Sequence, residues 1–118
     1  MYSVLFTLRL KDNRGFLNAY KKGGYVSDAN VVVYFVANKS PYNRLGISVS
    51  KKIGGAVERN RAKRIIRAAY RECEKYVPIG YDLVFVARAG IGDKRSTDIE
   101  RFIRKRLIDR INKKAGKK

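Results

Sequence analysis

The sequence predicts a single α+β domain in which helices pack against a small, mainly antiparallel sheet. Three runs of β-branched and aromatic residues predict strands, and three segments with apolar residues at helical spacing predict helices. With 118 residues, 45% of them hydrophobic, the chain has the length and the apolar side chains for one packed core. We therefore expect one domain over residues 1–118, with its elements in the order αββαβα.

The first predicted element is a helix over residues 13–22, which ends at Gly23-Gly24. Phe16, Leu17 and Tyr20 would share one side of this helix, because residues three and four apart are neighbours on a helix. We assign Leu17 to the core. By spacing alone the two aromatic rings also fit a core, which is the commoner place for such rings.

Two strands follow this helix. Residues 31–37 are apolar on both faces and predict an inner strand, and residues 25–28 could add a further strand. Residues 45–50 alternate between apolar and small polar side chains. One face of that strand would therefore be apolar, and the other would carry Ser48 and Ser50.

The second half of the chain predicts a long helix, a strand and a last helix. The long helix covers about residues 56–76, and the strand covers residues 81–88. Thr97 and Glu100 have the spacing of a capping box and predict the start of the last helix. Residues 113–118 are mostly lysine and are expected to form a frayed basic tail.

The charge balance restricts the class of partner. Lysine and arginine number 28 against 10 acidic residues, which gives a formal net charge of +18. A folded domain holds most of this charge at its surface, where a bound polyanion such as nucleic acid would relieve the repulsion. No apolar run approaches the ~20 residues of a membrane span, and the apolar segment 1–8 could form an edge strand. We therefore expect a cytoplasmic protein with no membrane partner.

The residue types exclude several kinds of catalytic centre. The chain has no histidine, which removes a histidine base, a histidine-activated nucleophile and a histidine metal ligand. Its single cysteine, Cys73, cannot form an internal disulfide or a multi-cysteine zinc site. The acidic residues are scattered and lack the clusters that metal-dependent nucleases use. We assign no catalytic and no metal-binding residue, so any chemistry must come from a partner.

The predicted helix over residues 56–76 separates apolar from cationic side chains. At about 100° per residue, its small and aliphatic residues form one arc, and its basic residues form the opposite arc. The apolar arc consists of Ala62, Ile65, Ile66, Ala69 and Cys73. What we call the cationic side includes two residues ahead of the helix and consists of Lys51, Lys52, Arg59, Asn60, Arg61, Lys63, Arg64, Arg67 and Arg71.

Two features of the cationic side favour phosphate binding over simple solvation. A solvated helix face usually mixes charge signs to form ion pairs at four-residue spacing, whereas here Glu58 is the one acid before Glu72 and Glu74. Arg59 and Arg61 also lie near the helix N-terminus, where cations oppose the helix dipole. Bound phosphates would relieve both tensions.

A gapless stretch over residues 44–67 carries a specific sequence signature. It contains Arg44 to Lys52, Gly54, Ala56, Val57, Arg59 to Arg61, Lys63, Arg64 and Arg67. These residues resemble the signature of the bacterial ribonuclease P protein subunit. The resemblance extends to Arg9-Leu10-Lys11, Phe16 and Tyr20 around the first helix, and to Val33-Tyr34 in the inner strand. For the fold it implies a left-handed β-α-β crossover.

The resemblance implies a non-catalytic protein subunit of an endoribonuclease holoenzyme. In that family the RNA subunit, with bound Mg²⁺, removes the 5′ leader from precursor tRNA during tRNA maturation. The resemblance further implies that the cationic side binds the RNA subunit, and that the leader lies in a cleft between the first helix and the sheet. The leader-binding residues would be Phe16, Tyr20, Tyr34, Ser48 and Ser50. No tightly bound metal and no protein partner are implied for the chain itself.

Two other functions remain open at this point. A ribosomal-protein-like structural protein that binds rRNA would share the size and the basicity, and a non-specific DNA-compacting protein would share the charge. Aromatic rings beside a cationic cleft favour RNA over DNA, because single-stranded RNA is recognised largely by stacking. Assisted cleavage of precursor tRNA would separate the ribonuclease P function from rRNA binding.

Overall fold

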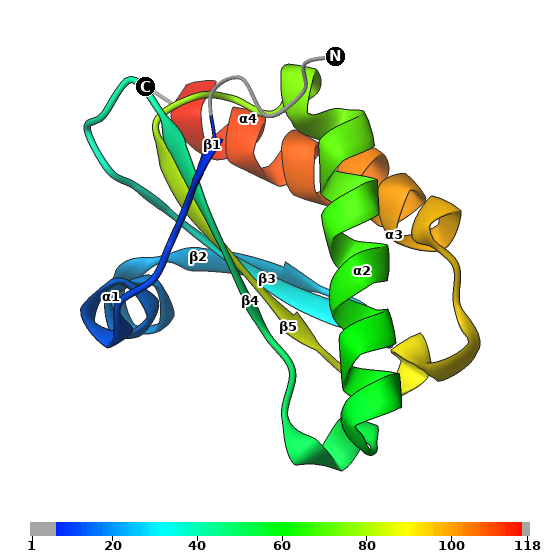
Figure 1. Ribbon diagram of the computed structural model, residues 1–118. Helices are drawn as coiled ribbons and strands as arrows, with labels where there is room; N and C mark the ends of the chain where they lie inside the picture. The colour runs from blue at the N-terminus through cyan, green and yellow to red at the C-terminus, as the bar shows by residue number, and fades with distance from the viewer. Residues whose placement is uncertain (1–6, 117–118) are drawn as a thin grey trace.

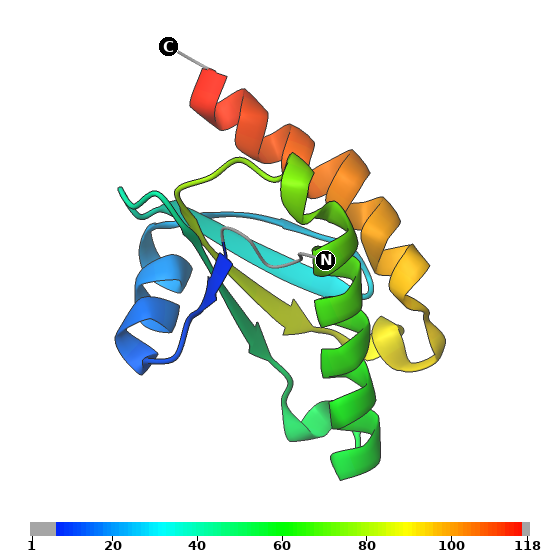
Figure 2. The same ribbon diagram turned by 45° about the horizontal axis from the view of Figure 1, so that its top comes forward.

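Helices cover both faces of a five-stranded sheet in the computed structural model, which describes residues 7–116 (Figure 1). The strands are β1 (Thr7–Arg9), β2 (Gly24–Ser27), β3 (Val31–Ala37), β4 (Asn43–Ser48) and β5 (Tyr81–Ala87). The helices are α1 (Asn13–Lys22), α2 (Ala56–Cys73), α3 (Ser96–Phe102) and α4 (Ile108–Gly116). Helix α1 lies on one face of the sheet, and α2, α3 and α4 lie on the other (Figures 1 and 2). The predicted α+β class is confirmed.

The predicted order αββαβα is present, with two strands added to it. β2 is the further strand that the sequence allowed, and β1 forms an edge strand that pairs with β4. Residues 1–6 of the apolar N-terminal segment lie outside the described residues. β4 ends at Ser48. Ser50 therefore lies outside the strand in which the sequence analysis placed it. Ser50 instead caps a short 3-10 helix over Lys51–Ile53, where its hydroxyl accepts from the Lys52 amide at 3.3 Å.

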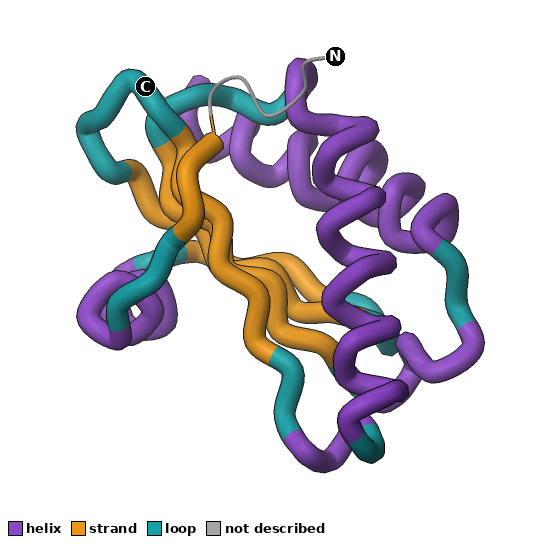
Figure 3. The backbone as a smooth tube through the Cα atoms, in the orientation of Figure 1, coloured by secondary structure: helices purple, strands orange, loops and turns teal. Residues whose placement is uncertain are grey.

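The sheet is mixed, where we expected a mainly antiparallel one. The β2–β3 and β3–β5 pairs are antiparallel, and the β1–β4 and β4–β5 pairs are parallel. The parallel β4–β5 pair arises because α2 returns the chain between two neighbouring strands, as the tube in Figure 3 shows. This crossover has the left-handed sense that the resemblance implies (Figure 1), against the general preference for right-handed connections.

The main core fills the space between the sheet and α2, α3 and α4. The predicted apolar arc of α2 is confirmed, since all of its members are buried there. A smaller cluster under α1 contains Leu10, Ala19 and Val84. Leu17 was wrongly assigned to the core: its side chain is 54% exposed. Ala19 and Phe16 pack into this cluster, and this orientation of α1 turns Leu17 towards solvent.

The C-terminal helix begins two residues earlier than expected, because its N-cap is Arg95 and not Thr97. Asp98, rather than Glu100, completes its N-terminal cap, because the Asp98 carboxylate accepts from the Arg95 amide at 2.9 Å. This hydrogen bond lowers the pKa of Asp98. A π-helical turn over Ile103–Leu107 joins α3 to α4, which continues to Gly116, inside the stretch that we expected to fray. Within residues 7–116, no helix has both the length and the hydropathy needed to cross a bilayer.

Cys73 provides a test of the core on this face of the sheet. Its side chain is fully buried, and burial raises the pKa of the thiol to about 11. We expect no alkylation by iodoacetamide near neutral pH until the protein unfolds, because the thiolate is the reactive form. Above about pH 9 the unfolded chain loses this proton before the folded protein does, so the free energy of unfolding should fall between about pH 9 and 11. Urea titrations across this range check the expectation, and an identical pH dependence in Cys73→Ala would contradict it.

Candidate RNA-binding surfaces

The cationic side of α2 is accessible in the folded chain. Lys51, Lys52, Asn60, Arg64, Arg67 and Arg71 are exposed, and Arg59, Arg61 and Lys63 are partly buried. The ion pairs found in the described part of the chain involve none of these residues. Within residues 7–116, no carboxylate forms an ion pair with these cations, so their charge is available to an anionic partner.

Arg59 and Arg61 also have structural roles. The Arg59 guanidinium donates to the Gly54 carbonyl at 2.8 Å, which helps to close the turn before α2. The Arg61 guanidinium donates to the carbonyl oxygens of Gly92 and Lys94, at 2.8 and 2.6 Å. It thereby joins α2 to the loop after β5. The loss of Arg61 would disturb this loop as well as any RNA contact.

Aromatic side chains gather on the opposite face of the sheet, beside α1. The Tyr20 and Tyr34 rings lie 4.9 Å apart, edge to face. Phe16 covers the backbone of β4 at Gly46, where an added Cβ would stand 2.6 Å from the end of the ring. Burial raises the pKa of Tyr20, so its hydroxyl stays neutral and can donate a hydrogen bond. The structure thus brings the three predicted rings together on one face.

Two adjoining hollows connect these rings to the cationic side. A hollow of about 590 Å³ between α1 and β4 is lined by Phe16, Tyr20, Ser48 and Lys63 among others. A larger one of about 860 Å³ beside β1 is lined by Leu8, Leu45, Lys63, Arg67 and Arg71 among others. Both share Phe16, Ile47 and Lys63, and we call the combined feature the aromatic groove. Aromatic residues of α1 form one wall of it, and cations of α2 form the other.

The predicted leader-binding residues do not all reach the aromatic groove. Phe16, Tyr20 and Ser48 line it, and Tyr34 extends the aromatic surface beyond Tyr20. Ser50 lines neither hollow, because its place at the start of the 3-10 helix takes it past the end of β4.

Tyr25 is an aromatic residue at this surface that sequence reasoning missed. It is 58% exposed, and its ring lies 5.8 Å from that of Tyr34. The two residues stand opposite each other in the antiparallel β2–β3 pair. The sequence did suggest a strand over residues 25–28. It did not show how that strand aligns with residues 31–37, so the pairing of Tyr25 with Tyr34 could not be predicted.

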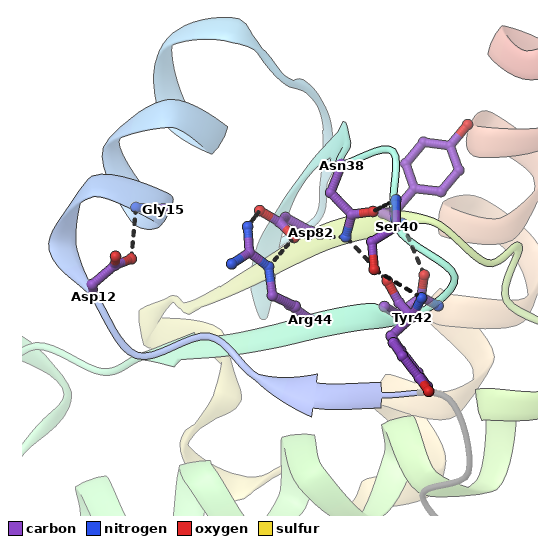
Figure 4. Close-up of polar contacts among 9 residues, drawn as sticks. Asp12, Gly15, Asn38, Ser40, Tyr42, Arg44 and Asp82 are labelled. Carbon is purple, nitrogen blue, oxygen red and sulfur yellow. Dashed lines mark hydrogen bonds and ion pairs between the residues drawn. The ribbon is translucent and has the colours of Figure 1, made fainter.

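A partly buried ion pair supports the other end of the same sheet face (Figure 4). Arg44 on β4 donates to both carboxylate oxygens of Asp82 on β5, at 2.8 and 2.7 Å. Asn38 donates to Asp82 at 2.9 Å and to the Tyr42 carbonyl at 3.1 Å. Asp82 thus holds the starts of two parallel strands together with the loop between β3 and β4. It also raises the pKa of Arg44.

The fold and these surfaces define a class: a small, basic α+β domain with a cationic helix face next to an aromatic groove. A family model described as Ribonuclease P matches residues 6–112. The chain is 43% identical over 107 residues to the Ribonuclease P protein component of Clostridioides difficile strain 630. The aligned region covers 90% of this chain and 93% of that protein.

Solved structures agree with the sequence comparisons. The RNase P protein of Staphylococcus aureus superposes with a TM-score of 0.75 at 37% identity, covering 89% of this chain and 94% of that one. The RNase P protein of Thermotoga maritima gives a TM-score of 0.76 at 31% identity, covering 86% and 96%. The chain belongs to the ribonuclease P protein family. It is a protein subunit of this endoribonuclease and a partner of the RNase P RNA.

Proposed function

We propose that this subunit binds the RNase P RNA through the cationic side of α2 and holds the 5′ leader of precursor tRNA in the aromatic groove. The observation that carries the proposal is the shared wall between the two surfaces. Lys63 lines both hollows of the groove and also belongs to the cationic side. A leader in the groove would therefore lie next to RNA that is docked on α2.

The contribution of the protein is electrostatic and positional. Lysine and arginine side chains neutralise phosphates that would otherwise repel each other where leader and RNA subunit approach. Aromatic rings in the groove stack unpaired bases without a strong sequence requirement. Both effects raise the affinity for precursor tRNA and reduce the Mg²⁺ concentration that the RNA needs to fold and react.

We assign the Mg²⁺ of the reaction to the RNA subunit. Mg²⁺ in proteins is usually held by carboxylates together with substrate phosphates. Within residues 7–116, acidic and thiol side chains nowhere gather in groups of three or more, which supports this assignment. We place the reaction in the cytoplasm, a reducing compartment that suits the single unpaired Cys73.

Reconstitution tests the proposal directly. The protein is added to a bacterial RNase P RNA with precursor tRNA at a Mg²⁺ concentration where the RNA alone is nearly inactive, and 5′ cleavage is measured. We expect the cleavage rate to rise well above that of the RNA alone. Unchanged cleavage together with retained binding to single-stranded RNA would contradict the proposal and favour an rRNA-binding structural role.

Replacement of Tyr34 tests the leader site. Tyr34 is half-buried between Tyr20 and Tyr25. Because stacking of one base contributes about 1–3 kcal/mol, Tyr34→Ala should weaken binding of precursor tRNA by about 5- to 150-fold and leave mature tRNA unaffected. Equilibrium binding to the reconstituted holoenzyme measures both affinities.

Tyr34→Phe is the matched control, because it keeps the ring and should retain most of the affinity. Thermal melts accompany each variant to detect loss of folded protein. Equal losses on precursor and mature tRNA would remove Tyr34 from the leader site.

A further inference from the structure

Tyr25 extends the aromatic surface to the far edge of the sheet. Its ring is tilted by 39° to that of Tyr34, and more than half of its side chain is exposed. The side chain contributes little to either core cluster. An exposed aromatic ring beside a second ring is suited to stacking a base.

Cations surround Tyr25. Lys21 and Lys22 form the last turn of α1, three and four residues before it, and both are exposed. From the other side of the strand, Arg110 on α4 donates to the Tyr25 carbonyl at 3.0 Å. Arg106 donates in the same way to the Ser27 carbonyl at 3.3 Å. These contacts cover outward carbonyls of the edge strand and place two guanidinium groups at the edge of the sheet that carries Tyr25.

The strand order shows how far Tyr25 lies from the cationic side of α2. Across the sheet face, Ser48 on β4, Tyr34 on β3 and Tyr25 on β2 follow one another, with β5 between the first two. At about 4.8 Å per strand, β4 and β2 are separated by roughly 14 Å. The cations of α2 border the β1–β4 edge of this face. Tyr25 therefore lies on the strand farthest from the β1–β4 edge, one strand beyond Tyr34.

We propose that Tyr25 stacks a second leader nucleotide, farther from the cleavage site than the nucleotide held at Tyr20 and Tyr34. The inference rests on the proposed function, because it requires the leader to cross this face from the α2 side. The leader begins at the cleavage site, which the RNA subunit holds. Later leader nucleotides must then lie progressively closer to β2. A short leader would end before Tyr25, whereas a longer leader would reach it. The protein would therefore bind precursor tRNAs with longer leaders more tightly.

A leader-length series tests the proposal. Holoenzyme is reconstituted with wild type, Tyr25→Ala or Tyr25→Phe, and its affinity is measured for precursor tRNAs whose leaders increase one nucleotide at a time. We expect the wild-type affinity to rise in two steps as the leader lengthens. Tyr25→Ala should remove the second step, a loss of about 5-fold or more, and leave the first step and mature tRNA unchanged. Tyr25→Phe should keep both steps.

The control for an exposed tyrosine is Tyr76→Ala. Tyr76 is 52% exposed and lies after α2, beside Lys75 and Arg104, away from the groove. It should behave as wild type with every leader. Because the Tyr25 side chain is largely exposed, all variants should melt close to the wild-type temperature.

The possible results separate this inference from the proposed function. If Tyr34→Ala loses leader affinity while Tyr25→Ala matches wild type at every length, the second position is wrong and the leader site stands. If Tyr25→Ala loses equally on all leaders and on mature tRNA, the inference is also overturned. If neither variant responds to the leader, the proposed leader site itself fails.

Discussion

Replacement of Lys63, Arg64 and Arg67 together by alanine should lower the affinity for RNase P RNA by about 100-fold at 0.1 M salt. Each lysine or arginine that neutralises a phosphate contributes about 0.7–0.9 to the slope of log affinity against log salt concentration. The three residues lie on one side of α2, where Arg64 and Arg67 are exposed and Lys63 is partly buried, and none of them forms an ion pair within the described residues. The slope should therefore fall by about two units, which filter binding between 0.05 and 0.4 M salt measures.

This variant avoids the two arginines whose guanidinium groups bond to backbone carbonyls. Loss of Arg59 or Arg61 would combine an RNA effect with a change in the loops at Gly54 and Gly92. Lys63, Arg64 and Arg67 point away from the core, so their replacement should leave the melting temperature nearly unchanged.

The matched control removes the same charge from the C-terminal helices. Arg101, Lys105 and Lys113 are exposed on α3, the π-helical turn and α4. A triple alanine variant at these positions has the same net charge as the α2 variant. It should retain most of the affinity and the salt slope. Equal losses in both variants would mean that the RNA responds to the overall charge of the protein and that α2 is not a specific contact surface.

Asp82→Ala should reduce the free energy of unfolding by about 3 kcal/mol. Asp82 is 2% exposed and accepts hydrogen bonds from Arg44 and Asn38, so its loss leaves two donors without their partner. Removal of one member of a buried ion pair costs about 3–5 kcal/mol. We expect the lower end of that range, because the Arg44 side chain is 43% exposed and can turn into solvent. Urea unfolding at constant salt measures the change.

A double-mutant cycle identifies the cause of this loss. Arg44→Ala and the double variant are measured beside Asp82→Ala. The double variant should be clearly more stable than the sum of the two single losses predicts, because the pair is then absent as a whole. Strictly additive losses would mean that Asp82 acts through Asn38 and the β3–β4 loop alone.

Local sequence patterns were sufficient to place the functional helix. The apolar arc of α2 and its cationic side follow from the spacing of residues along one helix, and every residue predicted for that arc is buried. Tyr70, which is also buried on α2, was not predicted. The strands 31–37 and 81–88 were predicted to within a residue for the same reason, since a run of apolar β-branched residues can be read without knowing its neighbours.

The predictions failed where the position of a residue or strand depends on a segment distant in the sequence. Leu17 and Phe16 are adjacent and both apolar, and only the position of the sheet decides that Phe16 packs on Gly46 while Leu17 is exposed. The parallel pairing of β4 with β5 required the crossover through α2, which no spacing rule predicts. Ser50 left the strand because a 3-10 turn, with its own capping bond, begins there.

Composition and periodicity were enough to predict a basic partner of a polyanion, to place the cations of one helix on one side, and to exclude histidine chemistry. These properties follow from composition and from periodicity along single elements. Tertiary structure alone decided which aromatic residues form a surface, because Tyr25 and Tyr34 meet only through the register of β2 with β3. It also decided that Lys63 and Phe16 border the same groove. Helical and strand periods specify which residues share a side, whereas packing between distant segments specifies what that side faces.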